Sequence, residues 1–256
     1  MKKRINKYLP AIKFTASLIP VSVVAGWFTG LYSIEYVTEE MLSEALAVFG
    51  SESMLVLITM AQAVLYAVFC AFFGYILADK VNLIKPFKIE KEALKKTLVY
   101  SVVFGIIFSM DYWVFGYFDP MIKIIDEETV TLNMVMAGIF YGGVVEELMM
   151  RLFFMSLIAV IVRKLFFKSC DRENIPQKVY FIANLIASIA FAAGHLPATI
   201  VYFGSLTPIV LLRCFLLNGG FGFLFGHIYQ KYGIQYSMIC HALMHVISKG
   251  IWFIFI

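Results

Sequence analysis

The stretch VVEELMMRLF, residues 144–153, holds three charged side chains inside one of the most apolar parts of the chain. In a helix, residues four apart share a face, so Glu147 and Arg151 are predicted to neutralise each other. Glu146 points about 100° away from Glu147 and is left without that partner. An unpaired carboxylate removed from water suits a general acid or base, so Glu146 is a candidate catalytic residue. The alternative is that all three residues form a structural polar cluster between helices.

Three histidines are the candidate partners of Glu146. His195 ends the stretch FAAGH, beside a glycine and a proline that indicate a helix end, and taken alone it suits function and packing equally. His241 and His245 are four residues apart and are predicted to lie on one helix face. That spacing suits two zinc ligands, and it equally suits two hydrogen-bond donors for an oxyanion. The remaining alternative is two unrelated interior histidines.

The elements that must position these side chains are membrane-spanning helices. Of 256 residues, 61% are hydrophobic and only 15% are charged, against about 25% charged in an ordinary soluble domain. Seven apolar segments approach or exceed the ~20 residues that a spanning helix needs, at about residues 14–34, 53–78, 97–118, 132–162, 178–196, 207–229 and 234–256. Helices are the open-chain structure that satisfies the backbone in lipid, so the sequence predicts an all-α bundle of about seven spans.

Polar residues are unevenly distributed over these spans. The first three carry few, which predicts a three-span N-terminal region (1–130) with a basic cytoplasmic loop and a four-span catalytic core (131–256) within one membrane domain. Asp111 and Arg213 either pair with each other or lie near the outer boundary. His227 is expected at the cytoplasmic interface, outside the site. The four cysteines form no CxxC pair and are expected to pack.

The connecting loops alternate between basic and acidic, and every basic loop falls on the same side. The positive-inside rule therefore predicts a cytoplasmic N-terminus. The net charge of +4 is confined largely to those loops, so nucleic acid is not an expected partner. An uncleaved basic first span suits a bacterial plasma membrane. The expected partners are the lipid bilayer and a peptide or membrane-protein substrate, and the oligomeric state stays open.

The predicted depths of the candidate residues disagree. At 1.5 Å per residue, Glu146 and His195 lie roughly 24 and 26 Å from the cytoplasmic ends of their spans. His241 and His245 lie only about 10 and 16 Å from theirs. A helix kink at Gly142 and Gly143, helix tilt, a buried turn at QKYG or a wrong span boundary would reconcile these values.

Three motifs in order carry a family resemblance. EELMMR (146–151) fits the pattern EExxxR, FAAGH (191–195) fits FxxxH, and HALMH (241–245) fits HxxxN with His245 in place of asparagine. Over about residues 130–250 the chain resembles the CAAX protease and bacteriocin-processing family, also called the abortive-infection family of intramembrane proteases. The resemblance implies an all-helical membrane bundle around a polar cavity. It also implies peptide-bond cleavage: the best-known members remove the last three residues of prenylated CAAX proteins, and bacterial relatives are linked to bacteriocin immunity, peptide export or signalling.

The resemblance also implies roles for individual residues. Glu146 matches the glutamate that activates a water, and His195 matches the histidine that assists it. The last motif, His241 and His245, matches the group that stabilises the oxyanion. Glu147 and Arg151 match supporting positions. The implied mechanism is that of a glutamate peptidase without a cofactor. The bacterial setting expected from the N-terminus makes a small membrane-bound or secreted peptide the expected substrate.

Other functions remain open at this point. Since histidine binds metal more readily than asparagine, a zinc-dependent hydrolase is one alternative, with ligands Glu146, His195, His241 and His245. A non-proteolytic, partner-binding member of the family is another. A proton-coupled transporter is the third, although the chain shows no inverted repeat.

Overall fold

The computed structural model describes the backbone of residues 2–256 and the side chains of residues 7–128 and 130–256. Within this part the chain is helical and has no strand. Six helical runs are long and apolar enough to cross a membrane: Lys7–Tyr36, Glu52–Lys80, Lys91–Phe118, Gln177–Phe203, Pro208–Tyr232 and Ile234–Phe255. The segment predicted at 132–162 is also helical, from residue 132 to 166 without a break. The all-α, multi-span fold is therefore confirmed.

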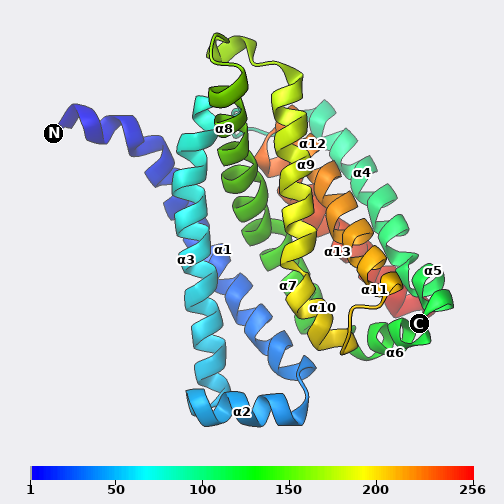
Figure 1. The fold of residues 1–256 in the computed structure, drawn as a ribbon. Helices are drawn as coiled ribbons and strands as arrows, with labels where there is room; N and C mark the ends of the chain where they lie inside the picture. Colours follow the sequence, from blue (N-terminus) through cyan, green and yellow to red (C-terminus); the bar gives the residue numbers. More distant parts are fainter. Residues whose placement is uncertain (1) are drawn as a thin grey trace.

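The first two long helices form a pair along one side of the molecule (Figure 1). Helix α1 (Lys2–Tyr36) packs against α3 (Glu52–Lys80), and the short α2 (Glu39–Phe49) connects them at one end. The approach is close, because a Cβ atom added to Gly30 would lie 2.9 Å from the Cα atom of Val56. Thr38 and Ser51 cap the N-termini of α2 and α3 by accepting backbone N–H groups.

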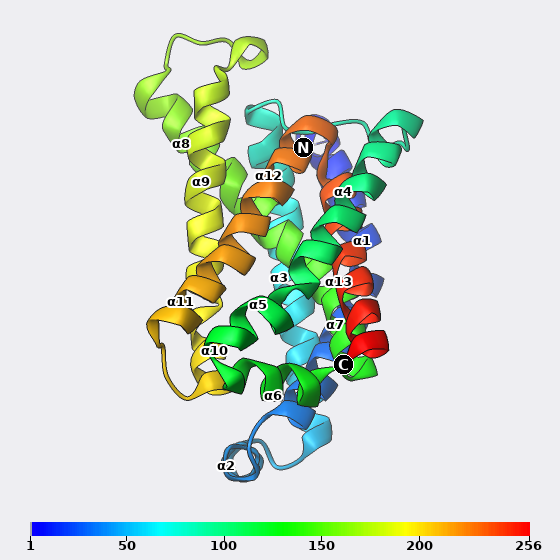
Figure 2. The same ribbon diagram turned by 90° about the vertical axis from the view of Figure 1, so that its right-hand side faces the viewer.

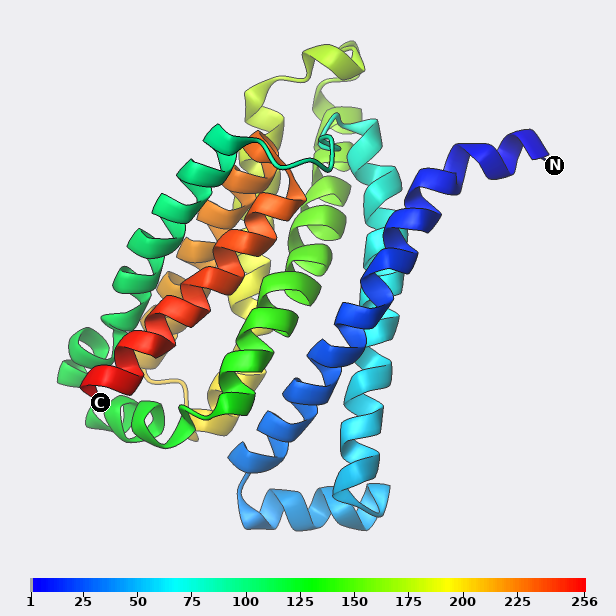
Figure 3. The same cartoon turned by 180° about the vertical axis from the view of Figure 1, so that it is seen from behind.

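Helix α4 (Lys91–Ser109) lies along α13 (Ile234–Phe255) on the opposite side of the molecule, as Figure 3 shows. Gly105 allows this contact, since an added Cβ atom would clash with the side chain of Ile247, and the Trp252 indole donates to the Ser109 carbonyl at 2.9 Å. Helices α5 (Asp111–Phe118) and α6 (Pro120–Thr129) follow at the end of the bundle that also carries α2 (Figure 2). The N-terminal region thus packs directly onto the C-terminal one.

The run that contains Glu146 differs from a regular α-helix. It starts as α7 (Leu132–Ala137), continues as the π-helical segments η1 (Gly138–Glu146) and η2 (Leu148–Met155), and ends as α8 (Ser156–Phe166). The sequence does not predict this widened hydrogen-bond pattern. Short π-helical segments are frequent at functional sites. Glu147 stands at the junction between η1 and η2.

The other core helices come from the last third of the chain. A short 3-10 turn, η3 (Arg172–Asn174), leads to α9 (Gln177–Gly194), and α10 (Leu196–Phe203) continues from it through His195. The return run consists of α11 (Pro208–Cys214), η4 (Phe215–Gly220) and α12 (Phe221–Tyr232). Gly233 alone joins α12 to α13, with φ of 110°, a backbone conformation that favours glycine.

The α12–α13 turn removes the predicted disagreement in depth. Residues 81–90 cover this turn: the Gln235 amide donates to the Pro86 carbonyl at 3.1 Å, and the Tyr236 hydroxyl accepts the Glu90 N–H at 2.7 Å. Helices α8 and α9 extend well beyond the turn (Figures 1 and 2). His241 and His245, which lie a short way along α13, are therefore at the same depth in the bundle as His195, which lies a long way along α9. The QKYG turn, which residues 81–90 cover at its Gly233 end and beyond which α8 and α9 extend, is the feature that brings the four residues to one depth.

Candidate active site

The two adjacent glutamates occupy different environments. Glu147 is fully buried, and its Oε1 atom lies 3.5 Å from the Arg151 guanidinium on the same helical run. The ion pair predicted from their spacing is therefore confirmed. On the opposite helix, His241 Nδ1 lies 2.9 Å from Oε1, and the Ser237 hydroxyl donates to Oε2. Glu147 thus links the central helical run to α13.

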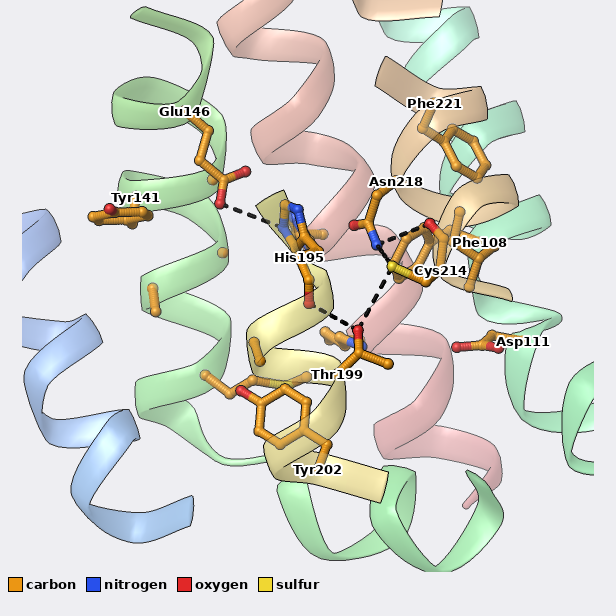
Figure 4. Close-up of a pocket in the computed structure, with 18 of the residues that line it drawn as sticks. Phe108, Asp111, Tyr141, Glu146, His195, Thr199, Tyr202, Cys214, Asn218 and Phe221 are labelled. Atoms are coloured by element: carbon orange, nitrogen blue, oxygen red, sulfur yellow. Dashed lines mark hydrogen bonds and ion pairs between the residues drawn. The ribbon is translucent and has the colours of Figure 1, made fainter. Parts of the chain in front are cut away.

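Glu146 faces a cavity instead. Its side chain is 20% exposed, and Oε1 lies 3.8 Å from His195 Nε2 (Figure 4). This separation exceeds a normal N–H···O hydrogen bond. Two polar atoms at such a distance are suited to share a bridging water. The spacing argument that left Glu146 free of Arg151 agrees with this arrangement.

His195 is positioned by a break between two helices. It follows the last residue of α9 and precedes α10, at the helix end that the sequence predicts. Its Nδ1 atom lies 2.8 Å from the Phe191 carbonyl. A carbonyl oxygen only accepts, so Nδ1 carries a hydrogen in this contact. In the neutral ring the Nε2 atom is then a free acceptor, and it is the atom that faces Glu146.

His241 and His245 form a contact pair on α13. Their Nε2 atoms lie 3.2 Å apart, and Phe225 stacks on the His241 ring with 4.3 Å between centroids. A hydrogen bond at that distance requires one proton between the two nitrogens. The glycines of η1 allow the approach, because a Cβ atom added to Gly142 would lie 3.2 Å from His245 Nε2.

The four predicted residues share one cavity of about 410 Å³, formed by the N-terminal, central and C-terminal helices. Glu146, His195, His241 and His245 all line it. From them the cavity extends toward the end of the bundle that carries α6, past Tyr36 at the end of α1. Figure 4 shows Tyr202 and Asp111 in this part of the cavity, away from Glu146. His227 does not line it, in agreement with the prediction.

The donor geometry fits zinc only in part. Two imidazole nitrogens bound to one zinc at about 2.0–2.1 Å in a tetrahedron are separated by roughly 3.3 Å, and the two Nε2 atoms of His241 and His245 are 3.2 Å apart. However, among the side chains that the structure describes, no group of three or more His, Cys, Asp or Glu residues converges as a metal site. The other expected ligands, Glu146 and His195, face each other instead.

Several residues of the site escape sequence reasoning. Ser237 lies four residues before His241 on α13, and that spacing is the signal that places both on the Glu147 side. Asn218 of η4 lines the cavity and donates to the Cys214 carbonyl at 3.1 Å. Asp111 and Arg213, left open above, do pair: the Arg213 guanidinium binds both carboxylate oxygens of Asp111. Lys249 also lines the cavity. Its position four residues after His245, inside the apolar segment 234–256, is the sequence signal for it.

Comparison with protein families agrees with the geometry. Residues 128–247 match the family described as type II CAAX prenyl endopeptidase Rce1-like. This region belongs to the CAAX protease family. The matched segment starts before α7 and ends two residues after His245, so it includes every candidate residue of the CAAX protease motifs. Comparison with curated proteins and with solved structures finds no significant match.

Proposed function

We propose that this protein is an intramembrane endopeptidase in which Glu146 activates the attacking water and His195 assists it. The family match supports intramembrane protease activity in general. The single observation that supports the specific mechanism is that Glu146 and His195 face each other at 3.8 Å on the wall of a cavity within the helical bundle. The carboxylate and the imidazole come from different helices and converge on a space that a water and a peptide carbonyl can enter.

The reaction follows from the available acceptors. A water between the two residues donates one hydrogen to the Glu146 carboxylate and the other to His195 Nε2. As its oxygen attacks the scissile carbonyl, Glu146 takes up the first proton. The resulting carboxylic acid then gives that proton to the leaving amine when the C–N bond breaks. One proton passes through Glu146, and the enzyme returns to its starting state.

The pair His241 and His245 supplies the oxyanion donor in this proposal. The N–H between their Nε2 atoms is redirected to the carbonyl oxygen as negative charge develops there. Glu147 holds the His241 ring through Nδ1 and stabilises positive charge on it. Glu147 is thus a positioning residue, and Arg151 in turn balances the charge of Glu147.

The test uses purified protein in lipid nanodiscs with a library of membrane-associated peptides. Glu146→Gln and His195→Ala are expected to abolish cleavage, whereas the control Glu44→Gln, on the exposed face of α2, retains it. Full cleavage by both site variants would overturn the mechanism. In cells, mass spectrometry of membrane and secreted peptides from wild type and Glu146→Gln identifies the products that depend on the enzyme.

The proposed setting is a bacterial plasma membrane with a cytoplasmic N-terminus. The end of α8 carries Arg163 and Lys164, the start of α9 carries Lys178, and the segment after α3 carries Lys85 and Lys88, whereas the charged residues of α2 and α6 are mainly acidic. This distribution supports the proposed orientation. A small membrane-bound or secreted peptide, such as a bacteriocin precursor, is the proposed substrate. Reporter fusions after residue 256 test the orientation, since the C-terminus is expected outside.

A zinc-dependent hydrolase is the second candidate, because the separation of the two Nε2 atoms, His241 to His245, suits two ligands of one ion. It predicts stoichiometric zinc in the purified protein and loss of cleavage on chelation. The metal-free proposal predicts neither result. His245→Asn gives a second comparison, because asparagine retains a hydrogen-bond donor and is a poor zinc ligand.

A further inference from the structure

A buried lysine lies in the same cavity, one helical turn beyond the histidine pair. Lys249 is 4% exposed and lines the cavity together with Glu146 and His195. Its ammonium nitrogen lies 3.4 Å from the centroid of the Trp252 ring and 5.5 Å from that of Phe108. Among the described side chains it has these aromatic neighbours and no hydrogen-bond or ion-pair partner. Burying such an ammonium is costly, and aromatic rings offset only part of the cost.

The neighbouring charged side chains that the structure describes form no ion pair with Lys249. Arg213 binds both oxygens of Asp111, and it also lies 3.5 Å from Asp126 of α6. Both aspartates contact the guanidinium, although Oδ2 of Asp126 is buried without a hydrogen-bond partner, and among the described side chains neither aspartate lies within ion-pair distance of Lys249. The three N–H donors of Lys249 remain available to a ligand in the cavity. In membrane proteins, an ionisable group kept at such a position usually marks a site.

The position on α13 sets the distance to the reacting groups. Lys249 follows His245 by four residues and His241 by eight, and all three lie on the cavity side of the helix. At 1.5 Å per residue these separations are about 6 and 12 Å along the axis. An extended peptide advances ~3.3 Å per residue. A group bound at Lys249 is therefore two to four residues from a carbonyl beside the histidines.

We propose that Lys249 binds a carboxylate of the peptide substrate, above all its terminal α-carboxylate, and so places the scissile bond two to four residues before that group. The proposal rests on the proposed peptidase function and deepens it. A lysine ammonium is a compact charge that pairs well with a carboxylate. The residue lies two positions beyond the segment that matches the family, 128–247.

The charge of Asp126 modulates this site. Helix α6 lies outside the six candidate spans. Burial, together with the charge of Asp111, raises the pKa of Asp126 to about 7. When Asp126 is ionised, the charges of Asp111, Asp126, Arg213 and Lys249 cancel. When Asp126 is protonated, the group carries one net positive charge, so a carboxylate is expected to bind more tightly below pH 7 than above it.

The experiment compares peptides of one sequence that end in a free carboxylate or in a carboxamide. For the wild type in nanodiscs, kcat/KM for the acid should exceed that for the amide by about 10- to 100-fold, the range of a charge-assisted hydrogen bond. Lys249→Met should remove this preference and cleave the amide as the wild type does. The control Lys231→Met, which removes an exposed lysine of α12 outside the cavity, should keep the preference. Equal cleavage of both peptides by the wild type, or an unchanged preference in Lys249→Met, would overturn the proposal.

A third peptide identifies the source of the carboxylate. It is an amide that carries glutamate as the third residue after the scissile bond, and recovery of the rate with it assigns the site to an acidic side chain instead of the chain end. Binding of the acid and amide peptides to Glu146→Gln, followed by fluorescence anisotropy, separates this proposal from the catalytic one. If the wild type cleaves no peptide but Glu146→Gln binds the acid at least tenfold more tightly, the peptidase mechanism fails and the carboxylate site stands.

Discussion

The carboxylate of Glu147 lies 2.9 Å from Nδ1 of His241, a residue 94 positions later in the chain. Glu147, the neighbour of the candidate base Glu146, therefore binds a histidine of another helix. This contact joins the EExxxR and HxxxH motifs into one hydrogen-bonded unit, in which Arg151 balances the charge of Glu147. The catalytic proposal depends on this unit, because it determines which way the His241 ring faces.

Removing Arg151 alone should lower the stability of the folded protein more than removing both members of the Glu147–Arg151 ion pair. Arg151→Met leaves the Glu147 charge buried beside His241, and breaking a buried pair costs about 3–5 kcal/mol. The double variant Arg151→Met/Glu147→Gln removes both charges and should recover part of that stability, but cleavage stays low because the His241 ring has lost its carboxylate. Thermal unfolding in detergent gives the double-mutant cycle. Additive losses in the two single variants would contradict the pairing.

The two substitutions at His245 should differ in their effect on cleavage. His245→Ala removes a donor, and loss of one oxyanion donor costs about 10²–10³ in rate. His245→Asn keeps an N–H donor and should retain cleavage within about tenfold of the wild type. Steady-state kinetics on one peptide measures both variants. Equal, complete loss in both would favour the zinc alternative.

Gly142→Ala should impair cleavage while the protein still folds. The new Cβ atom would lie 3.2 Å from His245 Nε2, closer than normal contact, and would push the ring away from His241. Gly250→Ala on α13 is the matched control, because an added Cβ atom there has nothing within 4 Å. The expected result is a fall in kcat for the first variant and wild-type kinetics for the second. A wild-type rate for Gly142→Ala would show that the histidine geometry tolerates displacement.

Asp126 should make stability depend on pH. Its pKa is raised from 3.8 to about 7 by burial and by Asp111, so the folded protein binds more protons than the unfolded chain between these values. The contribution of Asp126 to stability is therefore most favourable at low pH and falls as pH rises toward 7. The thermal midpoint of the wild type should drop between pH 5 and pH 8 by more than that of Asp126→Asn. Parallel pH profiles would refute the assignment.

Most of the fold could be predicted because its determinants are local. Apolar segments of spanning length must be helical in lipid, so the all-α bundle and the seven helical runs follow from composition. The break at His195 follows from the neighbouring Gly194 and Pro197. The π-helical segments η1 and η2 do not follow from local sequence. The glycines of η1 lie against α13, and η2 packs against α3 at Gly74, contacts that only the folded chain shows.

Part of the candidate site was also determined by the sequence itself. Helical spacing alone separates Glu147, paired with Arg151, from the free Glu146, because that geometry involves one helix. Depth required the tertiary structure, since it depends on how far α8 and α9 extend beyond the buried α12–α13 turn. The role of Lys249 also required the tertiary structure. Arg213 binds two aspartates from distant segments of the chain, and this contact, which only folding creates, leaves the buried ammonium of Lys249 without an ion-pair partner.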